Sequence, residues 1–400
     1  MKKFRLSELA VSLCFLAFLF GTMATTVLSE KEEESFFENR SLAAFPAYTA
    51  EADGDGSYTQ ALEKYVTDHA ALREPMLEAK TRLDLALGRP VVNDIVLSDG
   101  WFLPYLGYRQ VDEEEIAADA EKMADNLARI RDAAAEYGGH YCLVAVPNQY
   151  IYGAEAYPGY MDRQFEGERL GTELLEAGLE ARGVDFLDVG AVVEALGHPK
   201  GYMSKVDHHY TMEGAFLTYQ LLMEKLRDMT GAELPVLGEE DVVLETLPDP
   251  YLGSRARKLL GVASSDEKVQ ILRPREEVPF QRWDNGAESP PEVYVMPRED
   301  EYLTYSVYMG GDVAQTTIAT HREELPSILI YGDSFTNALE CVLYLSFDRM
   351  DSLDLRYGSG VSLTDYIRET QPDYVVCVRD YGALLVLSGN GGGEEDSSAD

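Results

Sequence analysis

Ser334 lies where a short apolar run gives way to a sequence typical of a helix. The run 327–331 is rich in Ile and predicts a buried strand, which Gly332 and Asp333 end. A helix is expected over 335–343. This arrangement places the Ser334 hydroxyl at the C-terminal edge of a sheet and its N–H at a helix N-terminus, as a serine nucleophile and its oxyanion require. The alternative is that Ser334 only caps the helix.

An aspartate and two adjacent histidines in the segment 206–211 could supply the base for such a serine. In extended backbone, side chains two residues apart share a face, so Asp207 and His209 are predicted to point the same way and His208 the opposite way. A carboxylate beside an imidazole fixes its tautomer and stabilises the imidazolium that forms when it takes a proton. Two alternatives remain open: a metal site, or ordinary polar residues before a helix capped by Thr211. No metal or other cofactor is predicted, because no second His or Cys cluster offers further ligands with suitable spacing.

The composition is that of an acidic globular protein. The 400 residues are 46% hydrophobic and 26% charged, and 71 acidic against 34 basic residues give a formal net charge of −37. Such a surface repels phosphate backbones, so nucleic-acid binding is not expected, nor is flat adhesion to an anionic membrane surface. The four cysteines are too few for a disulfide scaffold and lack metal-ligand spacing, so they are predicted to be small buried apolar residues.

The N-terminus carries a long apolar segment behind a basic flank. The flank 1–8 should stay in the cytoplasm, and the apolar residues 9–28 are enough to span a bilayer. An acidic run at 30–34 follows on the other side. We expect a single-pass anchor in the cell membrane with the main domain outside the cytoplasm. A cleaved signal peptide, with small residues around 22–24, is the alternative, and the protein would then be secreted.

Alternating strand and helix patterns predict an α/β fold with a doubly wound parallel sheet. After a tether at 29–57, the domain is expected over 58–387, with a β-rich insertion at 235–325 and a disordered acidic tail at 388–400. The main helices are predicted at 57–87, 112–137, 163–182 and 212–229, and the main strands at 140–146, 184–189, 327–331 and 374–378.

Two of these segments resemble the blocks of a known family. Gly332–Asp333–Ser334–Phe335 looks like the serine block of SGNH hydrolases. The segment 207–215 resembles the Asp-x-His-Trp-Thr-x-x-Gly-Ala block of the alginate O-acetyltransferase proteins AlgJ and AlgX, and it is closer still to the bacterial DHHW family. Further pieces resemble the family's blocks in the family's order over about residues 35 to 380: Glu38–Asn39–Arg40 with Leu42 and Pro46, 68–73, Leu252–Gly253–Ser254, 308–312 and 354–357.

The resemblance implies an SGNH hydrolase-like domain with acyl-ester chemistry, facing outward from the membrane. By position, Ser334 matches the nucleophile, His209 the base and Asp207 its partner. The Asp-x-His block comes before the serine, as in AlgJ and AlgX and in reverse of ordinary SGNH esterases. Tyr210 stands where the family has Trp, which keeps an aromatic ring. The family also implies a polysaccharide substrate and a membrane-bound acyltransferase partner that passes acyl groups across the membrane.

The oxyanion-binding blocks of SGNH enzymes have no plain match in this chain. Besides the N–H of Ser334, the candidates are the backbone of Gly310 and Gly311 and the side-chain amide of Asn148, which follows a predicted strand. A tight turn for the two glycines and a loop cap for Asn148 are the competing interpretations.

The sequence therefore predicts an acyl esterase or O-acetyltransferase that acts on an envelope or secreted glycan. The alternative from another class is a non-catalytic glycan-binding or scaffold protein that keeps the fold. Ester turnover that depends on Ser334 distinguishes the two. A metal-dependent hydrolase, the third possibility, would require bound metal in the purified protein.

Overall fold

The computed structural model describes residues 6–29, 31–48, 58–107, 110–161, 165–298, 301–357 and 362–391. The chain forms two compact units, one of residues 1–95 with 256–264 and one of 96–255 with 265–400. This division differs from the expected domain 58–387, because the helices after residue 57 cluster with the N-terminal segment.

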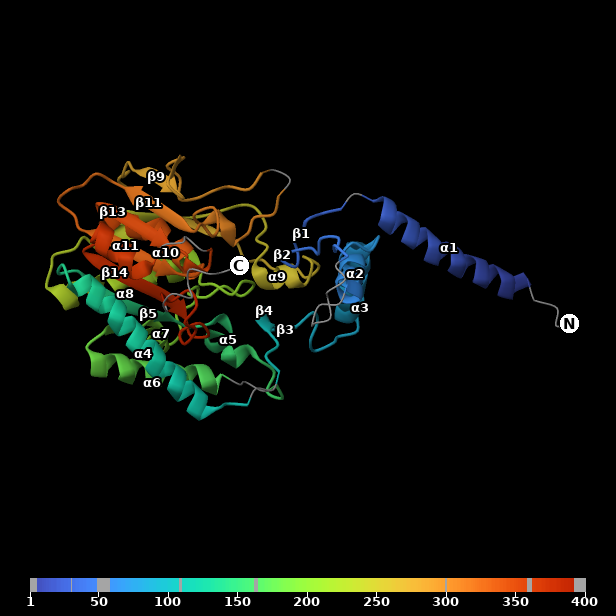
Figure 1. Cartoon of the computed structure of the whole chain (residues 1–400), viewed down its shortest axis with the longest axis horizontal. Coiled ribbons are helices and arrows are strands. Elements are labelled where there is room, and N and C mark those ends of the chain that lie inside the picture. Colours follow the sequence, from blue (N-terminus) through green and yellow to red (C-terminus); the bar gives the residue numbers. More distant parts are fainter. Residues whose placement is uncertain are drawn as a thin grey trace. The chain divides into compact units, whose positions relative to one another are not determined.

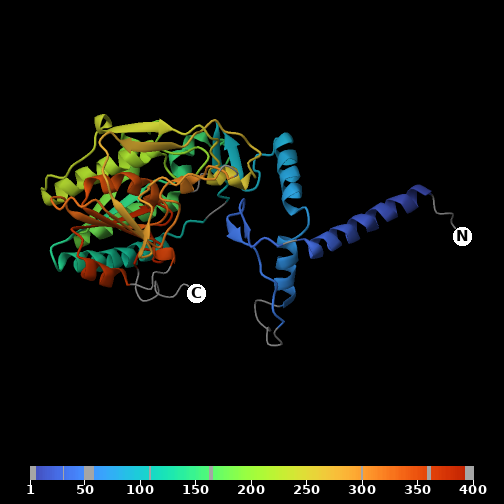
Figure 2. The ribbon, with the colours of Figure 1, turned by 90° about the horizontal axis from the view of Figure 1, so that it is seen from above.

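The N-terminal unit is built from helices and one small hairpin (Figures 1 and 2). Its first helix contains the apolar stretch Leu9–Leu28, which is long and apolar enough to cross a membrane, with a mean hydropathy of 2.0. The expected N-terminal apolar helix is thus confirmed. The elements are α1 (Leu6–Leu28), β1 (Glu34–Ser35) paired antiparallel with β2 (Arg40–Ser41), α2 (Tyr58–Asp68) and α3 (Arg73–Ala86).

The second unit contains an eight-stranded sheet in the order β10-β9-β11-β13-β12-β14-β5-β6. The five strands from β13 to β6 are parallel, and β11, β9 and β10 continue the sheet by antiparallel pairing. The predicted α/β class with a mostly parallel sheet is confirmed. The strands are β5 (His140–Val146), β6 (Asp185–Asp188), β9 (Gln281–Asp284), β10 (Ala287–Ser289), β11 (Gln315–Ala319), β12 (Ser327–Gly332), β13 (Arg349–Leu353) and β14 (Tyr374–Asp380).

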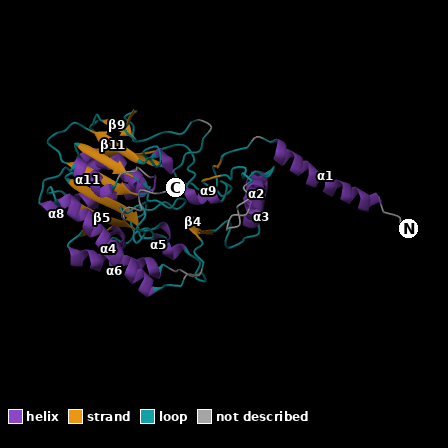
Figure 3. Ribbon diagram, in the orientation of Figure 1, coloured by secondary structure: helices purple, strands orange, loops and turns teal. Residues whose placement is uncertain are grey.

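Helices cover both faces of this sheet, and Figure 3 shows the strands among them. In β12 the alternating residues Ile328 and Ile330 join one apolar core, and Leu329 and Tyr331 join the other. Strands buried on both faces are near-continuous hydrophobic runs, which is why the sequence pattern was informative here. The first core includes α7 (Val189–Ala195), α8 (Met212–Thr230) and α10 (Phe335–Leu343), and the second includes α4 (Glu113–Ala135), α6 (Glu166–Arg182) and α11 (Leu363–Thr370).

The parallel strands follow a doubly wound order only if the chain is counted from β12. Numbered from there as β12, β13, β14, β5 and β6, they lie in the order 2-1-3-4-5, which is the flavodoxin-like arrangement. The first strand in this numbering, β12, thus comes from the last third of the sequence, and the last strand, β6, comes from the first half. Ligands in such sheets bind at the C-terminal edge where the order reverses, and this point lies at the end of β12.

Smaller elements complete the unit. The predicted β-rich segment 235–325 contains two strands that pair with each other, β7 and β8, and three that extend the main sheet. The remaining elements of the described chain, of which β3 and α9 extend across the limits of the first unit, are β3 (Ile95–Ser98), β4 (Trp101–Pro104), α5 (Gln149–Tyr152), β7 (Val242–Thr246), α9 (Ser254–Lys258), β8 (Gln270–Pro274), and 3₁₀ helices at Ala154–Ala156, Glu239–Asp241, Tyr305–Val307, Tyr344–Ser346 and Leu355–Tyr357.

The end of the described chain is packed into this unit. A disordered tail was expected from residue 388, but Asn390 is only 1% exposed. Its side chain accepts hydrogen bonds from Arg379 Nε at 2.9 Å and Cys377 Sγ at 3.4 Å, and it donates to Ala383 O at 3.2 Å. These contacts hold the segment after β14 against the sheet. Residues 392–400 lie outside the described residues.

Candidate active site

Ser334 occupies the turn between β12 and α10, at the C-terminal edge of the sheet. Gly332 is required before it, because a Cβ there would lie 2.2 Å from Val378 O on the neighbouring strand. Asp333 Oδ1 accepts a hydrogen bond from Phe335 N at 3.0 Å, so the aspartate satisfies an N–H of the first helical turn. The Ser334 side chain forms no cap hydrogen bond, which removes the helix-cap alternative.

A continuous chain of hydrogen bonds joins the three residues that the sequence singled out. His209 Nε2 lies 2.7 Å from Ser334 Oγ, and His209 Nδ1 lies 2.6 Å from Asp207 Oδ1. His209 is 4% exposed and Asp207 is 1% exposed. Because Asp207 accepts from Nδ1, the Nε2 atom is left with the lone pair that a general base uses toward a serine hydroxyl.

The segment that carries the two histidines is a loop, and the prediction of an extended strand there was wrong. Only Met203 and Tyr210 form a bridge, and the residues between them turn back on themselves. His209 N donates to Asp207 Oδ1 at 3.1 Å, as in the local turns that aspartate favours. The loop brings Asp207 and His209 together as expected, but His208 does not point away from them.

His209 lies between two other rings. Tyr305 stacks on it with a centroid distance of 3.7 Å and an interplanar angle of 8°, and His208 approaches to 3.7 Å at 38°. His208 Nδ1 also lies 2.7 Å from Ser254 Oγ. Burial, and then the neighbouring His209, lower the pKa of His208 to about 3, so this ring is neutral near neutral pH. Tyr305 lies almost a hundred residues from His209 in the chain, and no local pattern in the sequence indicated its role.

Asp207 is held as a carboxylate. Burial alone would raise its pKa, but the facing His209, its hydrogen bond, His208 and the N–H of Ser254 together keep the pKa well below its ordinary value. Ser254 N donates to Asp207 Oδ2 at 2.6 Å. Gly253 permits this approach, since a Cβ there would lie 2.4 Å from Val206 O and 3.0 Å from Asp207 Cβ. The segment 252–254 thus belongs to the site, a role that the sequence suggested only through its resemblance to a family block.

Tyr210, which replaces the family's Trp, ties the histidine loop to the serine turn. It is 1% exposed, and its hydroxyl donates to the carbonyl oxygen of Phe335, the residue after Ser334. The ring of Phe335 also lies 4.9 Å from that of His209. Two segments more than a hundred residues apart are therefore fixed relative to each other by a side chain that, like Trp, has an aromatic ring and a hydrogen-bond donor.

A pocket of about 330 Å³ opens in front of Ser334. Buried Arg379 donates to Asp333 Oδ2 at 3.3 Å and to Ser388 O at 3.0 Å, so it joins the serine turn to the segment after β14. Arg356 contributes a second guanidinium and forms ion pairs with Asp354 and Asp312. The lining residues are His208, Asp333, Ser334, Phe335, Arg356, Arg379, Asp380, Gly382, Ala383, Val386 and Ser388.

Of the oxyanion candidates, only Ser334 lines this pocket. Within the described residues its N–H has no hydrogen-bond acceptor, so it is available to a ligand. Asn148 Nδ2 donates to Asp380 Oδ1 at 2.6 Å, and Asn148 Oδ1 accepts from Gly382 N at 3.1 Å. Gly310 and Gly311 form a turn with positive φ values of 85° and 95°, as the competing turn interpretation expects.

The Asp207, His208 and His209 side chains come close enough to share a metal ion, with candidate ligand atoms within 4.8 Å of one another. Both carboxylate oxygens of Asp207 already accept hydrogen bonds, one from His209 and the other from Ser254. A metal would have to displace the bond between Asp207 and His209. The arrangement therefore fits proton transfer through His209 better than it fits metal coordination.

The doubly wound sheet, the Gly-Asp-Ser turn and the Asp-x-His loop at its C-terminal edge define an SGNH hydrolase-like domain. Residues 96–291 match the family described as "SGNH hydrolase-like domain, acetyltransferase AlgX". The matched segment contains Asp207 and His209 but ends before Ser334, whose place beside them comes from the structure. No curated protein matches the sequence.

Solved structures share this fold at low sequence identity. The chain is similar to Bacillus cereus PatB1, solved with a sulfonyl adduct, at a TM-score of 0.59 and 19% identity over 72% of this chain and 95% of that one. It is also similar to a DHHW family protein from Eubacterium siraeum DSM 15702, at a TM-score of 0.56 and 18% identity over 76% of this chain and 95% of that one. The expected resemblance to the DHHW and AlgX proteins is confirmed.

Proposed function

We propose that this protein is a membrane-anchored, extracytoplasmic O-acetyltransferase or acyl esterase that acts on a polysaccharide through Ser334, His209 and Asp207. The hydrogen-bonded chain from Ser334 Oγ through both nitrogens of His209 to Asp207 supports this proposal most directly. The match of residues 96–291 to the AlgX acetyltransferase family supports the acetyl-transfer class. A scaffold protein would have no need for a buried, charge-stabilised imidazole that faces a serine in a pocket.

In this mechanism Ser334 Oγ attacks the carbonyl carbon of an acetyl ester while its proton passes to His209 Nε2. The imidazolium is stabilised by Asp207, which stays ionised. The tetrahedral intermediate then expels the donor's alcohol oxygen, which takes the proton from His209 and leaves an acetyl group on Ser334. A sugar hydroxyl attacks this acyl-enzyme, gives its proton to His209, and departs as the acetylated product when the proton returns to Ser334 Oγ. Water in place of the sugar makes the same steps an esterase reaction.

The negative charge on the tetrahedral intermediate has one backbone donor within reach in this proposal. Among the residues that the structure describes, the Ser334 N–H has no acceptor, and it stands at the N-terminus of α10, where the helix dipole favours an anion. Arg356 lies in the wall of the same pocket, where its charge is shared with Asp354 and Asp312. An oxyanion-binding role for Gly310, Gly311 and Asn148 remains a prediction. Asn148 would have to break its hydrogen bond to Asp380 before its amide could bind the oxyanion.

The test uses the full chain in detergent with a chromogenic acetyl ester. Wild-type protein should release the alcohol, and Ser334→Ala should abolish the release while leaving the melting temperature unchanged. An aryl sulfonyl fluoride should add its mass to the wild-type chain but not to Ser334→Ala, a probe suggested by the sulfonyl adduct of PatB1. Equal turnover and labelling in both proteins would refute the assignment and leave the non-catalytic scaffold.

The anchoring in the membrane is tested separately. A reporter fused after residue 40 should be active only outside the cytoplasm, because the basic flank precedes the apolar helix. The mass of the purified chain then distinguishes the two forms, since an anchor keeps residues 1–28 and a cleaved signal loses them. A reporter active in the cytoplasm would refute export. The membrane-bound acyltransferase partner that the family implies would supply the acetyl groups on that side of the membrane.

A further inference from the structure

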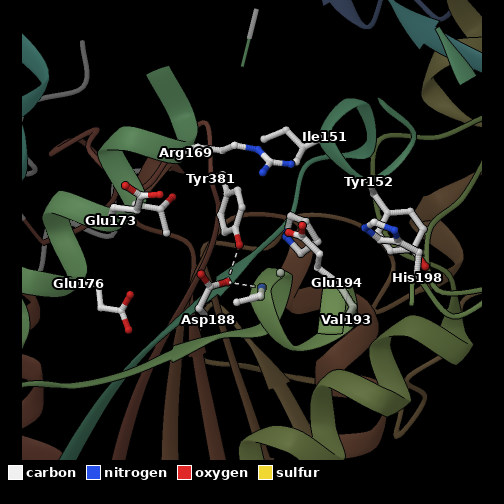
Figure 4. A pocket seen from close by; sticks show the side chains of 14 residues that line it. Ile151, Tyr152, Arg169, Glu173, Glu176, Asp188, Val193, Glu194, His198 and Tyr381 are labelled. Atoms are coloured by element: carbon white, nitrogen blue, oxygen red, sulfur yellow. Dashed lines mark hydrogen bonds between the residues drawn. The ribbon is translucent and has the colours of Figure 1, made fainter. Parts of the chain in front are cut away.

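A second pocket opens at the same edge of the sheet, two strands away from the strand that carries Ser334. It has a volume of about 260 Å³ and lies beyond the C-terminal ends of β5 and β6, where Pro147 follows one strand and Asp188 ends the other (Figure 4). The helices α6 and α7 supply its sides. Nothing in the proposed catalytic steps uses this pocket.

The end of β14 forms a ridge shared by both pockets. Asp380 lines the pocket of Ser334, and the next residue, Tyr381, lines the second pocket. The ridge is braced by Asn148, which donates to Asp380 at 2.6 Å, and by Asp188, which accepts a hydrogen bond from the Tyr381 hydroxyl. Strands β12 and β6 are three positions apart in the sheet, which corresponds to about 14 Å at the usual strand spacing. A chain of a few sugars can therefore reach from one pocket to the other.

The lining of the second pocket combines aromatic rings with acceptors of hydrogen bonds. Tyr381 and Tyr152 present half-buried rings, and Figure 4 shows the hydroxyl of Tyr381 directed at Asp188. Aromatic surface with a few placed polar groups is the composition of small-molecule sites. Carboxylates accept hydrogen bonds from neighbouring hydroxyls and, more strongly, from ammonium groups.

The charge of the lining restricts the kind of sugar. Glu173 and Glu176 extend from α6, and Glu194 extends from α7. Together with Asp188 they give four carboxylates in the lining, against the single guanidinium of Arg169. The formal charge of the pocket is thus −3 with His198 neutral. A polymer of uronic acids would be repelled here, and the net charge of −37 for the whole chain acts in the same direction.

We propose that this pocket is an acceptor subsite that binds a hexosamine with a free amine, a few residues along the glycan from the hydroxyl acetylated at Ser334. The proposal rests on the proposed function, and it names the substrate class as an amino-sugar polymer in place of a polyuronate. The rings of Tyr152 and Tyr381 contact the sugar face, and the glutamates bind its ammonium and hydroxyl groups. The shared ridge orients the glycan toward the serine.

Binding is tested without turnover, on the full-length Ser334→Ala protein by calorimetry at a mildly acidic pH. The probes are hexamers of glucosamine, of N-acetylglucosamine and of mannuronate. The glucosamine hexamer should bind about 10-fold or more tightly than its N-acetylated form, because charge-assisted hydrogen bonds are replaced by neutral ones. The mannuronate hexamer should show no binding. Equal binding of the two hexosamine probes, preference for mannuronate, or no binding of any probe would overturn the proposal.

A matched pair of triple variants then locates the site. Glu173→Gln, Glu176→Gln and Glu194→Gln together should remove the preference for glucosamine while the melting temperature is unchanged, since all three side chains are exposed. The control replaces three exposed glutamates outside the pocket, Glu180, Glu224 and Glu233, and makes the same change in net charge. If the control lost the preference equally, the effect would belong to the overall charge and the subsite would be refuted. Because Ser334 is absent from every protein in this test, its result is independent of whether the serine turns over esters.

Discussion

Each of the two units of the chain is stabilised internally by a different kind of contact. In the α/β unit, α4 buries a stripe of apolar residues that includes Met123, Leu127 and Ile130. In the N-terminal unit the only buried residues of α2 and α3 are polar, namely Asp68 in α2 and Thr81 and Asp84 in α3. Apolar packing therefore fixes the sheet and its site, whereas the buried contacts of α2 and α3 are polar and charged.

The contacts of Asp68 illustrate this dependence. Its two oxygens accept hydrogen bonds from Arg40 at 2.6 and 2.9 Å, and one of them also accepts from Ala43 N at 2.9 Å. The hydrogen bonds from Arg40 hold the pKa of Asp68 well below its ordinary value, against the effect of burial. From this difference we infer that the residues whose chemistry requires a fixed geometry lie in the α/β unit. Substitutions in the two units should therefore have different effects.

The largest effect is expected at His209, the proposed general base in the α/β unit. His209→Ala should lower acetyl-ester turnover by roughly 10⁴–10⁶-fold, about as much as Ser334→Ala, because a serine without its base is a poor nucleophile. The double variant should be little worse than either single one, since members of one catalytic unit are not additive. Steady-state kinetics of the three proteins measures this. Additive losses would show that the two residues act separately.

A smaller loss is expected at Asp207. Asp207→Asn keeps the shape of the side chain but favours the wrong tautomer of His209, so turnover should fall by roughly 10²–10⁴-fold. The near-ultraviolet circular dichroism spectrum should stay the same, because the hydrogen bond from Ser254 N can still be accepted. An unchanged rate would remove Asp207 from the site.

In the N-terminal unit, Asp68→Asn should affect local order but not chemistry. Losing the charge weakens the bonds from Arg40, so amide hydrogen exchange in α2 should become about 10-fold faster or more. Acetyl-ester turnover should stay within about twofold of wild type, because the hydrogen bonds of Asp68 join it to Arg40 and Ala43 and not to residues of the site. Glu63→Gln, an exposed change in the same helix, is the control and should alter neither quantity. Loss of turnover in Asp68→Asn but not in Glu63→Gln would contradict the inference that the site depends on the α/β unit alone.

Within the site, the smallest effect on turnover is expected at His208, which stacks on His209 but is not part of the hydrogen-bonded chain from Asp207 to Ser334. His208→Gln should keep most of the rate. Its effect lies in the pH dependence of stability, because the pKa of His208 is lowered from 6.5 to about 3 in the fold. Between these pH values the unfolded chain binds more protons, so the free energy of unfolding falls as the pH drops from about 6.5 to about 3. Chemical denaturation across this range should show a shallower fall in His208→Gln, and an identical slope would contradict the assignment.

The sequence indicated the serine turn more completely than the histidine loop. Ser334 follows a buried strand and precedes a helix, and both are local patterns that survive folding. The loop from Ser204 to His209 was expected to be extended, because alternation was the only signal in so short a segment. Its backbone is instead set by side-chain hydrogen bonds to Asp207 and Ser204, which no periodicity records.

Contacts between distant parts of the chain were beyond what sequence patterns could indicate. Tyr305 stacks on His209 from a segment described only as β-rich, and Arg379 joins the serine turn to Asn390. The doubly wound sheet was predicted, because strands buried on both faces leave apolar runs. The antiparallel extension of the sheet by β9, β10 and β11 was not predicted, since the composition of a strand does not indicate which other strand it pairs with.

The chain order of the sheet has a consequence for how the protein reaches its folded state. Synthesis delivers β5 and β6 first, yet His140 of β5 pairs with Tyr374 of β14, and β12 lies beyond β14. Until the last of these strands emerges, β5 presents an open edge that other chains can join. Pairings this far apart in sequence also fold slowly. Until then the first half has to be kept apart from other copies of the chain. A chain cut before residue 374 would lose β14, which lies between β12 and β5 inside the sheet, and not a strand at its edge.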